Sequence, residues 1–187
     1  MTRESLVALI LFGVGISSLV INESWIQYAA ALAALAFVYC QARILRAAKG
    51  IPAWRAPQVV ALIMTTALVE GTGLLLCMNS DVLAASLFIA AVIARALAWS
   101  RYWLGLRAAL KQPASRAALE SAGKALMQIG TIAPLAFVLG AYFLPQAAAL
   151  AGIAALATDW WLKFVLVTRA AFNQGFALPR LPVRGTR

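Results

Sequence analysis

The residues of this sequence best suited to chemistry are charged side chains inside otherwise apolar runs. They are Glu70, Arg95, Asp159 and Lys163. Ionisable groups cost at least about 2.5 kcal/mol each at the centre of a bilayer, so membrane proteins keep them for pairing or for moving protons, ions or substrates. We therefore interpret the four as an intramembrane polar set that can hold a polar group and handle protons.

Helical geometry predicts which of these charges meet. At about 1.5 Å per residue from the outer helix ends, Arg95 lies roughly 20 Å deep and Asp159 roughly 18 Å deep, so the two can pair across helices. Glu70 lies roughly 12 Å deep by the same rise, within reach of a long arginine side chain. Lys163 is one turn beyond Asp159 and can pair with it at i,i+4 or extend toward the interface.

Two interpretations of the polar set stay open at this point. In the first, an Arg95–Asp159 pair only locks the helices together. In the second, the charges line a polar cavity that opens from the cytoplasmic side, where a quinone head group accepts hydrogen bonds from Arg95 or Lys163 while a carboxylate handles its protons. Trp99 follows Arg95 by four residues on the same helical stripe and suits such a pocket.

The absence of histidine excludes a common class of redox site. A membrane cytochrome b needs axial imidazoles and an iron–sulfur cluster needs grouped thiolates, whereas this chain has no histidine and two separated cysteines. A Walker motif, a paired-histidine zinc site and a Gly-x-Ser-x-Gly nucleophile elbow are absent as well. We expect no heme and no metal in this chain.

The elements that must position these charges are membrane-spanning helices. Apolar residues make up 64% of the 187 residues, and several runs approach the roughly 20 residues that a spanning helix needs. The sequence predicts an all-α, polytopic transmembrane bundle of six helices within residues 1–175, followed by an extended basic tail over residues 176–187. The six predicted spans are residues 6–21, 25–44, 57–77, 82–106, 126–144 and 147–167.

The basic residues indicate the orientation of these spans. Lys and Arg gather in the loop after residue 44, in the loop after residue 106 and in the tail, while the turns at residues 22–24, 78–81 and 145–146 have none. The positive-inside rule then places both termini and the two long loops in the cytoplasm. Charges split in this way argue against nucleic-acid binding and suit anionic membrane lipids or an acidic partner.

The second long loop is expected to contain a short helix on the membrane surface. Ser115 is a possible N-cap, and Arg116, Glu120 and Lys124 follow at spacings that allow ion pairs on a helix. We predict that this helix lies along the headgroups, separate from the span at residues 126–144.

Several segments resemble one known family. The C-terminal signature of the dimethyl sulfoxide reductase membrane-anchor subunits, particularly those of phenylacetyl-CoA:acceptor oxidoreductases, resembles the segment that begins at Thr158, TDWWLKFVLVTRAAFNQGFALPRLPVRG. Two further segments are similar to the family: YCQARILRAAKGIPAWRAP from Tyr39 and ARALAWSRY from Ala94. The family's Ser-Arg-Glu motif resembles TRES from Thr2. The chain departs in helix number, since the family typically has eight helices.

The resemblance implies a heme-free anchor in a bacterial inner membrane. Such a subunit holds an iron–sulfur electron-transfer subunit and a molybdopterin catalytic subunit, and exchanges electrons and protons with ubiquinone or menaquinone. The glutamate of the Ser-Arg-Glu motif is associated with the family's quinone site, and the matching residue here is Glu4.

These inferences combine into one functional hypothesis with two rivals. The quinone-binding residues are predicted to be Glu4, Arg95, Trp99, Asp159 and Lys163. Docking of the partner subunits is assigned to Arg43, Arg46, Arg101, Arg180 and Arg184. A small membrane transporter or a purely structural anchor without a working quinone site would also explain the midplane charges.

Overall fold

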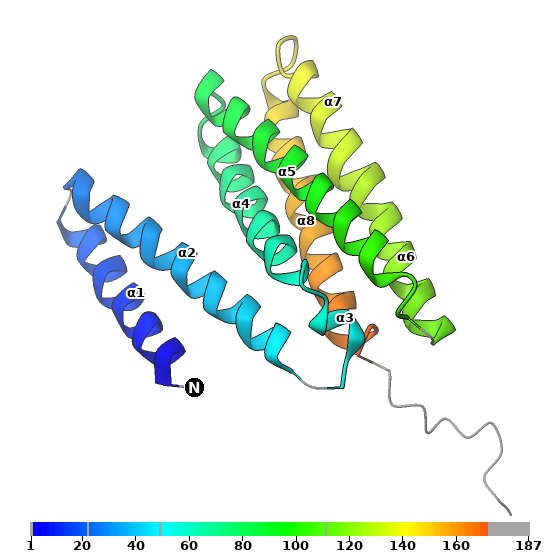
Figure 1. Ribbon diagram of the computed structural model, residues 1–187. Helices are drawn as coiled ribbons and strands as arrows, with labels where there is room; N and C mark the ends of the chain where they lie inside the picture. Colours follow the sequence, from blue (N-terminus) through cyan, green and yellow to red (C-terminus); the bar gives the residue numbers. More distant parts are fainter. Residues whose placement is uncertain (1, 22, 49, 111, 172–187) are drawn as a thin grey trace, which may run out of the picture.

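The computed structural model describes residues 2–21, 23–48, 50–110 and 112–171, and all regular elements in these ranges are helices (Figure 1). The tail predicted at residues 176–187, with Arg180 and Arg184, lies outside the described residues. The helices are α1 (Thr2–Val20), α2 (Ser24–Ala47), α3 (Pro52–Arg55), α4 (Val59–Met78), α5 (Val82–Leu106), α6 (Pro113–Met127), the π-helix η1 (Gln128–Ile132), α7 (Ala133–Gly140) and α8 (Gln146–Thr168).

Local sequence explains where several helices begin. Asp81 caps α5, because its Oδ1 accepts a hydrogen bond from the backbone N–H of Ala84 at 2.7 Å. Pro52 and Pro113 stand in the first turns of α3 and α6, where a missing N–H costs nothing. Gly50 has φ +102°, a left-handed conformation that suits glycine, and it reverses the chain between α2 and α3.

The helices form a bundle with a hairpin at its side. α4 packs along both α5 and α8, while α6, η1 and α7 pack together against α8. Figure 1 shows α1 and α2 as an antiparallel hairpin beside this bundle, attached to it through contacts between α2 and α4. Within the described part of α2 only Ile26 and Ala42 are buried, so most of the hairpin's apolar surface stays exposed.

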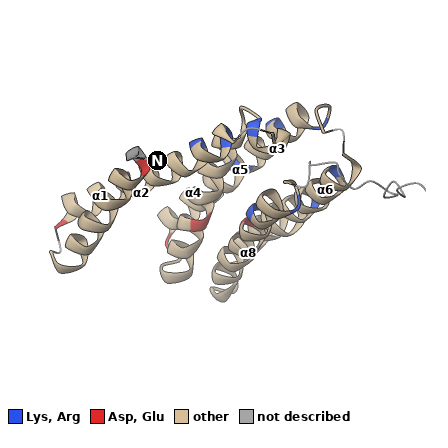
Figure 2. Ribbon diagram, turned by 90° about the horizontal axis from the view of Figure 1, so that it is seen from below, with Lys and Arg blue, Asp and Glu red and all other residues tan. Residues whose placement is uncertain are grey.

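Five helices are long and apolar enough to cross a membrane: α2, α4, α5, the continuous helix Pro113–Gly140 and α8. The first predicted span corresponds to α1, whose apolar part, Glu4–Val20, is shorter. Figure 2 shows most Lys and Arg gathered at the end of the molecule where α3 and α6 lie. The architecture is therefore that of a multi-pass helical membrane protein with one basic end.

The separate surface helix predicted after Ser115 is not observed. Helix α6 begins at Pro113 with Gln112 as its N-cap residue, and it continues through η1 into α7. Leu119, Ala122 and Leu126 are buried on one face of α6, which packs against α8 instead of lying on headgroups. No helix-breaking residue separates residues 115–124 from the span, so the two segments form one helix.

One feature of the predicted loop is confirmed. The Nζ of Lys124 lies 3.5 Å from Oε1 of Glu120, as the i,i+4 spacing predicts.

Two apolar clusters fill the bundle, one toward each end. Tyr102, Leu106, Leu119 and Leu166 belong to the cluster at the basic end, while Val69, Phe88 and Ala151 belong to the other. Arg95 stands between Val92 of one cluster and Trp99 of the other along α5, and Asp159 stands between Ala155 and Leu162 along α8. The buried charges thus form a layer between two hydrophobic regions.

Candidate functional site

Arg95 and Asp159 form a fully buried ion pair between α5 and α8. The Nη1 of Arg95 donates a hydrogen bond to Oδ1 of Asp159 at 2.6 Å, and both side chains have 0% exposure. The predicted pairing of these two residues is confirmed. A charge this deep in a membrane protein is retained only with a partner, because an unpaired one would cost several kcal/mol.

The same arginine also holds the π-helix of the neighbouring span. Its Nη2 donates to the backbone carbonyl of Gly130 and, at 3.2 Å, to the hydroxyl of Thr131. Residue 134 would normally donate its N–H to the carbonyl of Gly130 in an α-helix, but Pro134 has no N–H and its ring crowds that carbonyl. The proline therefore frees a backbone acceptor, and Arg95 uses it.

Gly130 is needed at this position for space. A Cβ atom at residue 130 would overlap the hydroxyl oxygen of Thr158 and would come to 3.4 Å from Nη2 of Arg95. Thr131 in turn donates its hydroxyl hydrogen to the carbonyl of Leu126 at 3.0 Å, which occupies another acceptor at the π-helix. The interruption of the helix is thus stabilised by hydrogen bonds from two side chains, Arg95 on α5 and Thr131 on the π-helix itself.

Lys163 takes a different partner from those considered in the sequence analysis. Its Nζ lies 2.8 Å from Oε1 and 2.7 Å from Oε2 of Glu70, so it links α8 to α4. The predicted alternatives, an i,i+4 pair with Asp159 or an Arg95–Glu70 contact, are not the hydrogen bonds observed. The reason is that Asp159 and Lys163, although one turn apart, point to different neighbouring helices.

The two ion pairs differ in accessibility. Arg95 and Asp159 have no exposed surface, so the open polar cavity predicted around them is not observed; close packing by the two apolar clusters fills that space. The side chains of Lys163 and Glu70 are 30% and 27% exposed. A ligand arriving from outside the bundle meets Lys163 and Glu70 first.

Trp99 packs inside the bundle near the basic end. Its ring stacks on Trp103 with centroids 5.9 Å apart and covers the backbone of Gly123, where any side chain would overlap it. A pocket of about 280 Å³ borders Trp99 and reaches Met127 and Gln128. Trp99 is 5% exposed, and its ring lies between Trp103 of α5 and Gly123 of α6.

Glu4 lies in the hairpin formed by α1 and α2. It lines a pocket of about 420 Å³ together with Tyr39, Cys40 and Arg43, and all the residues that line this pocket belong to α1 and α2. The predicted set of five quinone-binding residues is therefore distributed over separate places: the Arg95–Asp159 pair, Lys163 with Glu70, the Trp99 pocket and the hairpin.

The predicted docking arginines that the structure describes are exposed at the basic end. Arg43 and Arg46 lie in the last turns of α2, and Arg101 lies near the end of α5. Figure 2 shows basic residues on the helix ends around α3, where a soluble partner could approach the membrane. Docking of a partner subunit at these arginines stays a prediction.

Sequence reasoning missed the part played by Gly130, Thr131 and Pro134. The signal was present, because a proline inside an apolar span frees the carbonyl four residues earlier. Sequence reasoning also did not predict the Glu70–Lys163 pair. The depth of each residue along its helix can be counted from the sequence, but the rotation of α4 and α8 about their axes cannot.

Comparison with known proteins adds no identification. No protein-family model, no curated protein and no solved structure matches this chain. The fold and the buried charges define a class, a multi-pass membrane protein whose described residues include two ion pairs between helices of the bundle.

Proposed function

We propose that this chain is the membrane-anchor subunit of a multisubunit molybdopterin and iron–sulfur oxidoreductase in a bacterial inner membrane. It exchanges electrons and protons between a membrane quinone and an iron–sulfur subunit. In this proposal α1 is the sixth span and both termini lie in the cytoplasm. The observation that carries it is the partly exposed Lys163–Glu70 pair within two apolar spans, next along α8 to the buried Arg95–Asp159 pair.

The accessibility of this pair favours a lipid-soluble ligand. Lys163 and Glu70 lie within α8 and α4, which are long and apolar enough to span the membrane. A charged pair exposed there gains from a polar group that arrives through the hydrocarbon. A quinone head group fits this requirement because its ring and tail are apolar while its oxygens are polar.

The donor set also fits quinone chemistry. A bound quinone supplies two-electron redox chemistry coupled to the uptake or release of two protons. The ammonium group of Lys163 can donate a hydrogen bond to a quinone oxygen, and the carboxylate of Glu70 can accept or deliver a proton. Both groups already lie within hydrogen-bond distance of each other, so a proton can pass between them.

The buried Arg95–Asp159 pair lies next to the partly exposed Lys163–Glu70 pair along α8. Asp159 stands one turn from Lys163 on α8, and its Oδ2 has no hydrogen-bond partner within the described ranges. That oxygen is an acceptor able to take up a proton inside the bundle. Arg95 keeps Asp159 in place and compensates its charge, so the pair acts as a positioning element behind the quinone-contacting residues.

The basic end of the bundle is where the iron–sulfur subunit docks in this proposal. Exposed Arg43, Arg46 and Arg101 present positive charge that can attract an acidic patch on an iron–sulfur subunit. A subunit held there is placed at the membrane surface, near the ends of the helices that carry the charge layer.

The test is quinone-linked electron transfer in membranes that contain the whole complex. Glu70→Gln is expected to lower turnover about 100-fold, the lower range for loss of a general acid–base group, and Lys163→Met is expected to raise the quinone KM. Glu23→Gln, at an exposed outer turn, and Arg116→Met, on α6, are the matched controls and should retain activity.

Each rival function predicts a different result. A purely structural anchor would keep full turnover in Glu70→Gln and Lys163→Met as long as the complex stays assembled. A transporter would move a substrate across liposomes that contain this chain alone, and it would purify without molybdenum or iron. Either outcome would overturn the proposal.

A further inference from the structure

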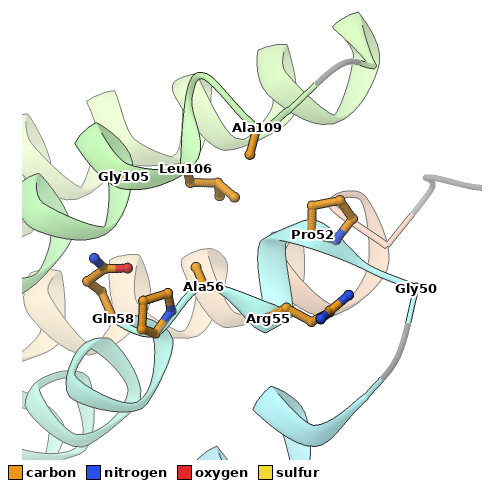
Figure 3. Close-up of a pocket in the computed structure, with 9 residues that line it drawn as sticks. Gly50, Pro52, Arg55, Ala56, Gln58, Gly105, Leu106 and Ala109 are labelled. Carbon is orange, nitrogen blue, oxygen red and sulfur yellow. The ribbon is translucent and has the colours of Figure 1, made fainter.

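A second site, separate from the charge layer, lies at the basic end. A pocket of about 460 Å³ opens between α3 with its flanking loop and the C-terminal end of α5. Figure 3 shows Pro52, Leu106 and Ala109 bordering the space, with Arg55 toward the end marked by Gly50 and Gln58 at the opposite end, near Gly105. None of the quinone or docking residues predicted from sequence lines it.

Long-range hydrogen bonds fix the shape of this pocket. The indole N–H of Trp54 donates to the carbonyl of Leu166 in α8 at 2.8 Å, and the hydroxyl of Tyr102 in α5 donates to the carbonyl of Ala53 at 2.9 Å. Ala53 and Tyr102 both have 0% exposure. The short helix α3 is therefore anchored to two spans, and the pocket is a built feature of the fold.

The polar groups of the pocket suit an anion. Arg55 is exposed and lines the pocket together with the amide of Gln58, and no acidic residue is among the lining residues. The Nε2 of Gln58 would lie 3.2 Å from a Cβ at residue 105, so Gly105 leaves room for this amide. The guanidinium of Arg55 offers several N–H donors to phosphate oxygens, and the amide of Gln58 adds a neutral polar group at the other end of the pocket.

The other walls of the pocket suit hydrocarbon. Pro52, Leu106 and Ala109 are apolar, and α4 and α5 continue from the pocket into apolar spans. A free phosphate would gain nothing from these walls, whereas the glycerol and first acyl carbons of a lipid would cover them. The location, at the junction of the basic end with the spans, is where phospholipid headgroups lie.

We propose that this pocket binds the phosphodiester headgroup of an anionic phospholipid from the cytoplasmic leaflet. The guanidinium of Arg55 contacts the phosphate, and Pro52, Leu106 and Ala109 contact the glycerol and the start of an acyl chain. The lipid joins the loop before α4 to the end of α5. This inference is independent of quinone chemistry, because the pocket shares no residue with the Lys163–Glu70 pair.

The experiment is lipid retention by the full chain in detergent, measured by native mass spectrometry during titration with phosphatidylglycerol or phosphatidylcholine. Wild type is expected to hold phosphatidylglycerol about tenfold more tightly than phosphatidylcholine, and Arg55→Ala is expected to remove that difference. Arg55→Lys should keep part of it, because an ammonium still contacts phosphate. Arg116→Ala, which removes an exposed arginine outside the pocket, should keep all of it.

Two further measurements identify the source of the bound phosphate and the contribution of the apolar pocket walls. Millimolar inorganic phosphate should leave bound phosphatidylglycerol in place, and Ala109→Phe should lower retention of both lipids by filling the pocket. Circular dichroism and gel filtration check that each variant is folded.

Three results would overturn the lipid site. The first is an equal loss in Arg55→Ala and Arg116→Ala, which would mean diffuse attraction. The second is displacement of the lipid by inorganic phosphate. The third is unchanged lipid retention in Arg55→Ala with lost binding of the soluble subunits, which would assign the pocket to a protein partner.

Discussion

Asp159 and Lys163 stand one turn apart on α8 but take their partners from different helices. Asp159 pairs with Arg95 of α5, and Lys163 pairs with Glu70 of α4. α8 therefore carries one charge of each sign and ties together three spans. The four charges sum to zero, so the layer is neutral as a whole while each pair is accessible to a different degree.

Removal of Arg95 should be much more harmful than removal of the whole buried pair. Arg95→Met leaves the Asp159 carboxylate buried without its cation, and we expect a loss of about 3–5 kcal/mol in the free energy of unfolding. The double variant Arg95→Met with Asp159→Leu should recover most of that loss. Chemical unfolding in detergent micelles measures both, with exposed Arg101→Met as the control.

The prediction for the buried pair fails if the double variant is as unstable as the single one. That result would mean that Arg95 stabilises the bundle mainly through Gly130 and Thr131 of the π-helix, to which it also donates hydrogen bonds.

A methyl group at residue 130 should destabilise the bundle at the π-helix. Gly130→Ala places a Cβ against the hydroxyl of Thr158 and close to Arg95, and overpacking of this kind typically costs about 1–3 kcal/mol. The combination Gly130→Ala with Thr158→Ala should recover part of the loss because it removes the overlapping oxygen. The melting temperature in detergent reports each variant.

Gly71→Ala is the control for the variant at residue 130. A Cβ at residue 71 meets nothing within 4 Å, so this change in a helix should be neutral or stabilise by about 0.5–1 kcal/mol. Equal destabilisation at residues 71 and 130 would show that the overlap with Thr158 is not the cause.

The Glu70–Lys163 pair should show a smaller coupling than the buried pair. Its side chains are partly exposed, and a double-mutant cycle with Glu70→Gln and Lys163→Met should give a coupling energy of about 1 kcal/mol. The reversed pair, Glu70→Lys with Lys163→Glu, should be more stable than either single reversal. A coupling energy near zero would contradict the hydrogen bonds between the two side chains.

The basic end should hold the soluble subunits through charge and through the tail. Removal of the chain from Phe176 onward is expected to release the hydrophilic subunits from membranes, and Arg43→Glu with Arg46→Glu should lower the salt concentration at which they dissociate. Immunoblots of washed membranes measure the release. A chain that ends at Gly185 is the control, and retention of the subunits after the longer truncation would remove the tail from the docking surface.

The spans and the charges within them were predictable because both are properties of the chain itself. Hydrophobic length predicted the regions that become α2, α4, α5, α8 and the second half of the helix Pro113–Gly140, and depth along the helices predicted that Arg95 meets Asp159. The separate surface helix after Ser115 was a wrong prediction. No helix-breaking residue separates this segment from the following span, and its apolar face packs against α8.

The partner of Lys163, the enclosure of Arg95 and the shape of the pocket between α3 and α5 were decided only by the tertiary structure. Composition and residue order specify how far each charge lies from a helix end, since the rise of a helix is constant. They do not specify the rotation of each helix about its axis or the closeness of neighbouring spans, which follow from packing at Gly73 and Gly152, Gly123 and Gly130. That packing determines which charge is sealed inside the bundle and which stays within reach of a ligand.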